Sequence, residues 1–248
     1  MAEPQVAIAL LADTTPPDIA AVLDAWRAQF PSLPVPAHVR GERGRAVIDE
    51  LTVDGHVVLL THIAAAAEGA VEALEHSWMW QVAPEPVKQH AAHVLVAGSD
   101  SGDAIGHALA VTRVAAAIVR ACNGAALYWP ASQQVHTPKV LHVFAGEDVP
   151  VSLWIGVTTS AASPTSPTNA ATHGLAAFGY KELEVLRSAM PVGDLRIALL
   201  AAADYVLRNK IVLEDGATFG LDEDTQWPVA HRASRLVPGR EAIVIDIP

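Results

Sequence analysis

The sequence of 248 residues contains a single cysteine, Cys122. One cysteine cannot form an intramolecular disulfide, so the chain is not a small disulfide-rich secreted domain, and nothing favours an oxidising compartment. Cys122 follows an apolar segment and precedes Asn123-Gly124, a pair that is typical of a helix end. We therefore interpret Cys122 as a small core residue and not as an activated thiolate.

Positive charge is also scarce, with 16 Lys and Arg residues against 27 Asp and Glu and a formal net charge of -11. Proteins that bind nucleic acids need a basic patch. The nearest candidate is the short run of Arg40, Arg43 and Arg45, which contains Glu42 and which we interpret as a solvated loop. We therefore expect no nucleic-acid partner, whereas an acidic surface would suit a basic protein partner.

Long hydrophobic runs without charges are missing. The nearest candidate, residues 104–122, is interrupted by Arg113 and Arg120, and the first residues lack the basic region of a signal peptide. We therefore predict a soluble, cytoplasmic protein without membrane association.

The sequence also lacks the recognised signatures of catalytic and metal sites. It has no Gly-x-Ser-x-Gly, His-Glu-x-x-His or Cys-x-x-Cys pattern. His90 and His93 would point to opposite faces of a strand, which is unsuitable for one metal ion. The segment Gly98–Asp103 lacks the lysine of a phosphate-binding loop, so we interpret it as a loop with Asp103 capping the next helix. We expect no catalytic residue, no metal and no cofactor.

The composition, with 51% hydrophobic and 17% charged residues, is that of a folded globular protein. In the first half, apolar patterns predict strands over residues 6–11, 46–51, 56–63, 91–97 and 125–129, and helices over residues 19–30, 68–80 and 104–120. Asp54-Gly55 marks a hairpin between two of these strands. The order strand–helix–strand–strand–helix–strand is the ferredoxin-like arrangement, and an irregular α+β sheet with an inserted helix is the alternative.

In the second half, the patterns predict strands over residues 151–160, 172–178, 182–186, 227–233 and 241–247, and a helix over residues 192–208. The Ser/Thr/Pro-rich residues 160–169 predict a long connection that could act as a lid or mark a linker. We predict an α+β fold with a mixed, mainly antiparallel sheet and helices packed on one face. Its parts would be a ferredoxin-like half, residues 1–150, and a second α+β half, residues 151–248, or both would form one continuous domain.

Three motifs in the second half follow one another in a recognisable order. They are Thr172-His-Gly-Leu-Ala-Ala-Phe-Gly-Tyr-Lys-Glu-Leu-Glu184, the helix end Ala203-Asp-Tyr-Val-Leu207, and Asp215-Gly-Ala-Thr-Phe-Gly220. Together they resemble DUF4261, a family of bacterial domains of unknown function, most strongly over residues 150–248. Some relatives in that family resemble proteins of bacterial immunity or toxin-associated neighbourhoods, which suggests an immunity-like role.

The first motif supplies the candidate polar site. Glu182 and Glu184 are two residues apart, so on a strand both carboxylates would project from one face. They could form an acid–base pair, hold a cation or bind a basic partner, or they could line a solvated sheet face and pair with Lys181 or Arg187. His173 lies in the same motif, and we expect it near one of the two glutamates across a bend. Replacing His173 with Ala should then remove an interaction without unfolding the chain.

Tryptophans supply a second candidate site. Trp78 and Trp80 stand close together before a proline-containing segment and could present an aromatic patch to a partner. The alternative is ordinary core packing. The two rings cannot share one face of a regular helix, so we expect at least one of them at a helix end or on the surface.

These observations favour a non-catalytic protein that binds another protein, in the manner of an immunity protein. The alternative is a small-molecule-binding protein or an enzyme, with a pocket around His173, Glu182 and Glu184 at the junction of the two halves. A structural homo-oligomer that pairs through a sheet edge is a third possibility.

Overall fold

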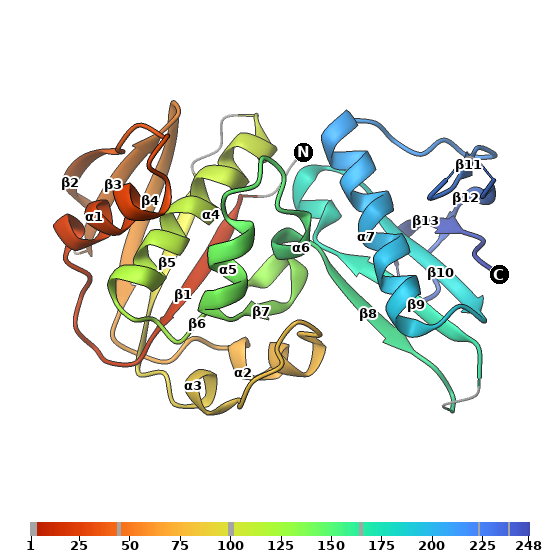
Figure 1. The fold of residues 1–248 in the computed structure, drawn as a ribbon, viewed down its shortest axis with the longest axis horizontal. Coiled ribbons are helices and arrows are strands. Elements are labelled where there is room, and N and C mark those ends of the chain that lie inside the picture. Colours follow the sequence, from red (N-terminus) through yellow and green to blue (C-terminus); the bar gives the residue numbers. More distant parts are fainter. Residues whose placement is uncertain (1–3, 44–45, 99–101, 164–165, 223, 238) are drawn as a thin grey trace.

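The first of two sheets has seven strands in the order β2-β3-β4-β5-β1-β6-β7, and every neighbouring pair is antiparallel. The computed structural model describes residues 4–43, 46–98, 102–163, 166–222, 224–237 and 239–248. The strands are β1 (Val6–Leu11), β2 (Ala37–Arg43), β3 (Ala46–Val53), β4 (His56–Ile63), β5 (Ala92–Gly98), β6 (Ala126–Trp129) and β7 (Gln134–His136). The helices α1 (Ile19–Gln29), α4 (Ala104–Ala121) and α5 (Pro138–Phe144) lie on one face of this sheet (Figure 1).

The centre of this sheet has a ferredoxin-like arrangement, although its second helix is α4 and not the helix predicted over residues 68–80. In the order β4-β5-β1-β6, β5 is antiparallel to both β1 and β4, which therefore run parallel to each other with β5 between them. Likewise β5 and β6 run parallel, with β1 between them. These are the two split β-α-β units of that fold, with α1 and α4 as their helices. The sheet is larger than expected because β2 and β3 extend one edge and β7 extends the other.

Strand β1 shows how the sheet separates two hydrophobic layers. Ala7, Ala9 and Leu11 are buried in the large cluster that includes α1 and α4, whereas Leu10 belongs to a smaller cluster on the other face. This alternation follows from the two-residue period of a strand. The smaller cluster is closed by the segment that carries the short helices α2 (Ala70–Ala73) and α3 (Glu85–Lys88), so the opposite face has a partial cover as well.

Helix α4 is the central helix of the fold. Of the described residues, it alone forms a helix long and apolar enough to cross a membrane, and 67% of it is buried within the fold, as in the core helix of a globular domain. Arg113, one of its two arginines, is buried and lies 3.5 Å from the carboxylate of Asp54 in the β3–β4 hairpin. This ion pair explains how a charge is tolerated in the middle of an otherwise apolar helix.

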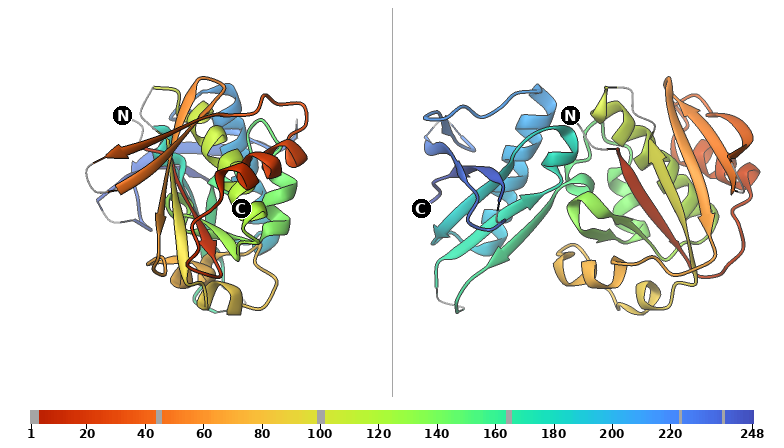
Figure 2. Two further views of the ribbon diagram at one scale, coloured as in Figure 1. Left: turned by 90° about the vertical axis from the view of Figure 1, so that its left-hand side faces the viewer. Right: turned by 180° about the vertical axis from the view of Figure 1, so that it is seen from behind.

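The second sheet has six strands in the order β11-β12-β13-β10-β9-β8 and is mixed, because β10 and β13 run parallel while the other pairs are antiparallel. Its strands are β8 (Gly156–Ser160), β9 (Thr168–His173), β10 (Glu182–Ser188), β11 (Thr218–Phe219), β12 (Trp227–Ala233) and β13 (Glu241–Ile245). Helix α7 (Val192–Asn209) covers one face, on the same side of the molecule as α1 and α4 (Figures 1 and 2). We call the parts built on the two sheets the N-terminal lobe and the C-terminal lobe.

An aromatic row joins the two lobes. Trp129 of β6, Trp154 of helix α6 (Val151–Trp154) and Phe178 follow one another with ring centroids 6.4 and 5.2 Å apart. The indole Nε1 of Trp154 donates a hydrogen bond of 2.7 Å to Thr112 Oγ1 of α4. All three rings belong to one hydrophobic cluster that extends through both lobes, so the lobes share a core although they have separate sheets.

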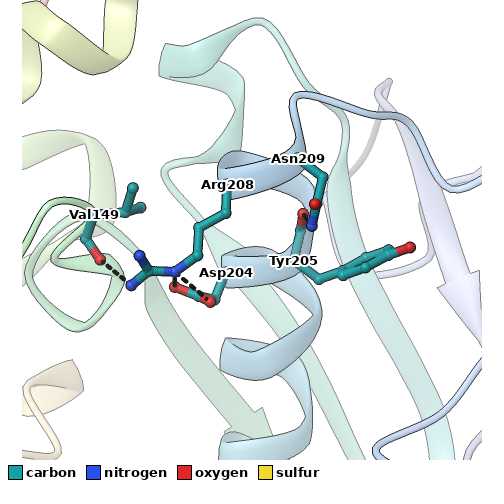
Figure 3. Close-up of polar contacts among 5 residues, drawn as sticks. All are labelled: Val149, Asp204, Tyr205, Arg208 and Asn209. Carbon is teal, nitrogen blue, oxygen red and sulfur yellow. Dashed lines mark hydrogen bonds and ion pairs between the residues drawn. The ribbon is translucent and has the colours of Figure 1, made fainter.

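Polar contacts reinforce this junction. Gln5 Nε2, at the start of β1, donates a 2.8 Å hydrogen bond to the carbonyl of Ala177 in the C-terminal lobe. Arg208 at the end of α7 reaches back to the chain before α6, where its Nη2 lies 3.3 Å from the carbonyl oxygen of Val149 (Figure 3). Asp204, one turn earlier in α7, accepts from Nε of the same guanidinium and orients it.

The predicted helix over residues 68–80 is wrong in its extent. Only α2 and a 3₁₀ turn, Leu74–His76, are helical. Ser77 ends the helix because its hydroxyl donates to the carbonyl of Ala73 and accepts from the backbone N–H of Val135, both at 2.7 Å. The Ser77 side chain thus ends the helix and attaches this segment to β7.

Two predicted strands of the second half are also wrong in part. Residues 151–154 form α6 and not the start of a strand, which allows Leu153 and Trp154 both to be buried although they are adjacent in sequence. The strand predicted over residues 172–178 ends at His173, and Leu175–Phe178 form a 3₁₀ helix. Gly174 makes this break possible with a φ of 120° and a backbone so close to Trp154 that a Cβ would lie 2.3 Å from its carbonyl oxygen.

The segment predicted as a basic loop is largely a strand, since Arg40 and Arg43 lie in β2. Strand β2 pairs with β3 over its full length. Arg45, residues 99–101 of the segment Gly98–Asp103 and residues 164–165 of the predicted lid lie outside the described residues.

Candidate functional site

Glu182, at the start of β10, holds the turn that follows β9. Its carboxylate accepts from Thr172 Oγ1 at 2.7 Å and from the backbone N–H groups of Gly174 and Ala176 at 3.0 Å and Leu175 at 3.3 Å. Burial raises the pKa of Glu182, and these four donors act in the opposite direction. The side chain therefore satisfies the otherwise free N–H groups at the start of the 3₁₀ helix Leu175–Phe178.

Glu184 holds a second loop in the same way. Only 1% of this residue is exposed, and its carboxylate accepts from the hydroxyl of Ser234 and from the N–H groups of Arg235 at 3.2 Å and Leu236 at 3.4 Å. Glu182 and Glu184 thus share one face of β10, as predicted, but that face is not solvated. Both carboxylates bind backbone groups of loops that meet above the strand.

Among the described residues, neither glutamate forms the ion pair with Lys181 or Arg187 that the sequence suggested. Lys181 Nζ lies 2.8 Å from the carboxylate of Glu241, on β13. Arg187 has a φ of 59° at an irregular position of β10, and its N–H donates to Asn169 Oδ1. Sequence spacing alone could not show this, because most of the donors for Glu182 and Glu184 are main-chain groups.

His173 is the last residue of β9 and directly precedes the turn that Glu182 holds. Its Nε2 is 2.8 Å from Thr158 Oγ1 on the neighbouring strand β8. Burial lowers the pKa of His173, and the nearby His76 and Arg240 lower it further. The imidazole is therefore neutral at pH 7, and its hydrogen bond goes to a hydroxyl group and not to the glutamates that we expected as partners.

Two adjoining cavities bring these residues together at the junction of the lobes. The first, of about 400 Å³, has His173, Glu182 and Glu184 in its lining, together with Gln133 and Arg240. The second, of about 480 Å³, shares Gln133 and His173 with the first. It is further lined by Glu75, His76, Ser77, Trp78, Val157, Thr158, Thr159, Ser160, Asn169, Arg196 and Leu236. We call the two cavities together the inter-lobe cleft, since both lobes contribute to its walls.

Arg196 of α7 is the strongest charge feature of the cleft. Its Nη2 donates to Thr159 Oγ1 at 3.2 Å, its Cζ lies 6.0 Å from the ring centroid of Trp78, and its Nε is buried without a hydrogen-bond partner. Within the described part of the chain, no carboxylate lies within 4.0 Å of this guanidinium. Burial lowers the pKa of Arg196, yet an arginine stays protonated under all ordinary conditions.

Trp78 and Trp80 do not form one aromatic patch. Trp78 packs against the large core cluster and lines the inter-lobe cleft. Trp80 packs against the smaller cluster on the opposite face of the first sheet and lines a separate cavity of about 670 Å³ with Val82 and Pro86. Of the two tryptophans, only Trp78 belongs to the site that contains His173.

His90 and His93, which lie outside the cleft, have structural partners. His90 Nε2 accepts from the N–H of Ala67 at 2.7 Å, and His93 Nδ1 is 2.7 Å from the carbonyl oxygen of Ala65. In the described ranges, no group of three or more His, Cys, Asp or Glu side chains is placed to hold a metal ion. Cys122 is half-buried, and burial raises the pKa of its thiol, with a smaller contribution from Asp13.

Arg196, Arg240, Gln133 and Thr158 belong to the cleft but carry no recognisable signal in the sequence. Arg196 stands next to Leu195 in the buried stripe of α7, which indicates only that it lies near the edge of that stripe. Gln133 belongs to the turn that precedes β7, with a φ of 54°. These residues are brought together by the packing of one lobe against the other.

Residues 171–247 match the family model of DUF4261, a domain of unknown function. The match confirms the resemblance that the three motifs indicated, and it includes His173, Glu182, Glu184, Arg196 and Arg240. No curated protein and no solved structure matches the chain.

Proposed function

We propose that the protein acts by binding and not by catalysis, and that the inter-lobe cleft holds a ligand that carries an anionic group. The observation that supports this proposal is the environment of Arg196. The Arg196 guanidinium is partly removed from water, its buried Nε lacks a partner, and no carboxylate lies beside it. Such an environment costs free energy, because neither the charge nor the N–H donor is compensated. A carboxylate or phosphate beside it would supply both the missing acceptor and the missing counter-charge.

The arrangement around Arg196 favours recognition over reaction. The oxygens of Glu182 and Glu184 are occupied by backbone N–H and hydroxyl donors, so neither carboxylate is free to transfer a proton. His173 shares a hydrogen bond with Thr158 and is not paired with a carboxylate that would make it a stronger base. In this proposal, the two glutamates fix the loops of the cleft, and His173 and Arg196 contact the ligand.

Thermal unfolding with simple anions tests this function. Phosphate, citrate and acetate would be compared with chloride at equal ionic strength, followed by calorimetric titration of any anion that stabilises the protein. A ligand at ten times its Kd stabilises the folded state by about 1.4 kcal/mol, which corresponds to a rise of roughly 4 °C in Tm for a chain of this size. Comparing phosphate with the carboxylates separates the two anion chemistries.

Three variants make the test specific. Arg196→Gln should remove the stabilisation, and His173→Ala should weaken it while keeping a cooperative unfolding transition. Arg120→Gln changes an exposed arginine at the end of α4 and should respond to anions as the wild type does. The proposal is wrong if no anion stabilises the wild type, or if Arg196→Gln responds to anions as strongly as Arg120→Gln.

A further inference from the structure

Strand β8 forms the outer edge of the second sheet. It pairs with β9 only, from Gly156 opposite His173 to Ser160 opposite Asn169. An edge strand presents a row of backbone N–H and C=O groups that no neighbouring strand uses. In this protein that edge is directed towards the N-terminal lobe, where β8 contacts the turn Leu74–His76.

The lining of the cleft shows that this edge is open. Four consecutive residues of β8, Val157 to Ser160, line the larger of the two cavities. Successive side chains of a strand point to opposite faces of the sheet, so a cavity on one face would touch only alternate residues. A cavity that touches all four therefore reaches the edge of the strand, and it extends over the sheet to Asn169 and His173 of β9. The opposite wall consists of residues 75–78 of the N-terminal lobe.

The beginning of the strand is closed by the N-terminal lobe. A Cβ on Gly156 would lie 2.2 Å from the carbonyl oxygen of Ser132 and 2.9 Å from Nε2 of Gln134. Gln134 Nε2 in turn donates to the carbonyl oxygen of His76 at 2.8 Å, which connects β7 to the opposite wall. The lobes therefore touch at Gly156, and Val157 is buried as well, so the open part of the edge begins at Thr158 and spans about 10 Å.

The charge beside this edge selects the kind of strand that would fit. Arg196 donates to Thr159 Oγ1 of β8 itself, so its guanidinium lies alongside the open edge. His76 and His173 also line this cavity, and among the described residues Glu75 is the one acidic residue of its lining. A chain that pairs with β8 would thus meet an unpaired positive charge at the level of Thr159, and Cζ of Arg196 lies 6.0 Å from the ring centroid of Trp78.

We propose that the ligand of the cleft is an extended peptide segment of a partner protein, which adds to β8 as a further strand and places a carboxylate on Arg196. Backbone hydrogen bonds to an open sheet edge supply affinity in this mode of recognition, and side-chain contacts supply specificity. The inference rests on the proposed function, because it assigns a peptide carboxylate to the anion position beside Arg196. It gives the expected protein partner a defined place on the molecule.

The probe is a phage-displayed library of random octapeptides, selected on the full-length protein. Enriched peptides should share Asp, Glu or a free C-terminus at one fixed position, and a synthetic peptide from this set should bind Arg196→Gln at least tenfold more weakly than the wild type. Arg120→Gln is the matched control and should bind the peptide as the wild type does. Methylating single backbone nitrogens should then weaken binding by about tenfold at alternate residues of the peptide segment that pairs with β8 and not outside it, because alternate N–H groups point to the paired strand.

The outcomes separate this inference from the function on which it rests. If simple anions stabilise the protein through Arg196 but the library yields no binder, or if backbone methylation is tolerated at every position, strand addition is wrong and the anion site stands. If peptides bind with the alternating methylation pattern but equally well to Arg196→Gln, the edge of β8 is a docking site and the role of Arg196 is wrong.

Discussion

His136 offers a sharp test of the junction between the lobes. The residue is 1% exposed, and its Nε2 lies 3.0 Å from the carbonyl oxygen of Leu153, so Nε2 carries the proton of the neutral ring. Nδ1 is buried without a hydrogen-bond partner, which leaves no acceptor for a second proton. Burial accordingly lowers the pKa of His136 from 6.5 to about 4.

This depressed pKa makes the stability of the protein depend on pH. Above pH 6.5 the imidazole is neutral in both the folded and the unfolded state, and its burial carries no charge penalty. As the pH falls from 6.5 towards 4, the unfolded chain binds a proton that the folded chain does not, so stability is lost over this range. The difference between a pKa of about 4 and one of 6.5 corresponds to about 3 kcal/mol, lost at up to about 1.4 kcal/mol per pH unit.

The assay is urea unfolding of the wild type and of His136→Gln at half-unit steps from pH 8 to pH 4. Glutamine keeps a donor for the carbonyl of Leu153 but cannot bind a proton. We expect the two stabilities to run parallel above pH 7 and the wild type to lose about 3 kcal/mol relative to the variant by pH 4. Because other titrating groups contribute equally to both proteins, curves that stay parallel down to pH 4 would refute the assignment of a buried, neutral His136.

Three further predictions concern single side chains near the cleft. Glu182→Ala should lower the free energy of unfolding by about 3 kcal/mol, since three backbone N–H groups lose their acceptor. The control Glu241→Gln, at an exposed ion pair, should lower it by less than about 1 kcal/mol, and chemical denaturation measures both values. Gly156→Ala should destabilise the protein by about 1–3 kcal/mol, because its Cβ would meet the carbonyl of Ser132, and a Tm equal to that of the wild type would contradict the close contact between the lobes. Arg196→Met should leave the ligand-free protein at least as stable as the wild type, because methionine fills a similar space without a partly buried charge, and it should abolish anion binding. A fall of several degrees in the Tm of the ligand-free variant would mean that Arg196 is structural.

The sequence predicted the elements whose pattern is strong and local. Strands β1, β4 and β5 and helices α1, α4 and α7 have regular apolar spacing and clear end signals, such as Asp18 and Asp103, whose side chains bond to the first turns of α1 and α4. The pattern failed where a distant residue decides the local conformation. Ser77 ends a helix by bonding to Val135, 58 residues later, and the break after His173 depends on Glu182.

The candidate site was predicted in part. The motif Thr172–Glu184 directed attention to His173, Glu182 and Glu184, and the structure places all three along one cavity. Most of the hydrogen-bond partners of the two glutamates could not be predicted, because they are backbone groups, which have no identity in a sequence. The partner of His173, Thr158, lies on another strand. The other wall of the cleft comes from residues 75–78 and Gln133, which only the packing of the two lobes brings near.

The family match covers only part of the second sheet, and this limits where the protein can be cut into fragments that fold. The match begins at residue 171, inside β9 (Thr168–His173), so β8 and the first half of β9 precede it. A fragment cut at that point would expose the side of β10 that β9 normally covers and would lose Trp154, which packs on Phe178. Even a fragment that began before Gly156 would leave Trp154 without Trp129 and Thr112. The segment that defines the family is therefore shorter than the smallest unit that can keep its own core closed.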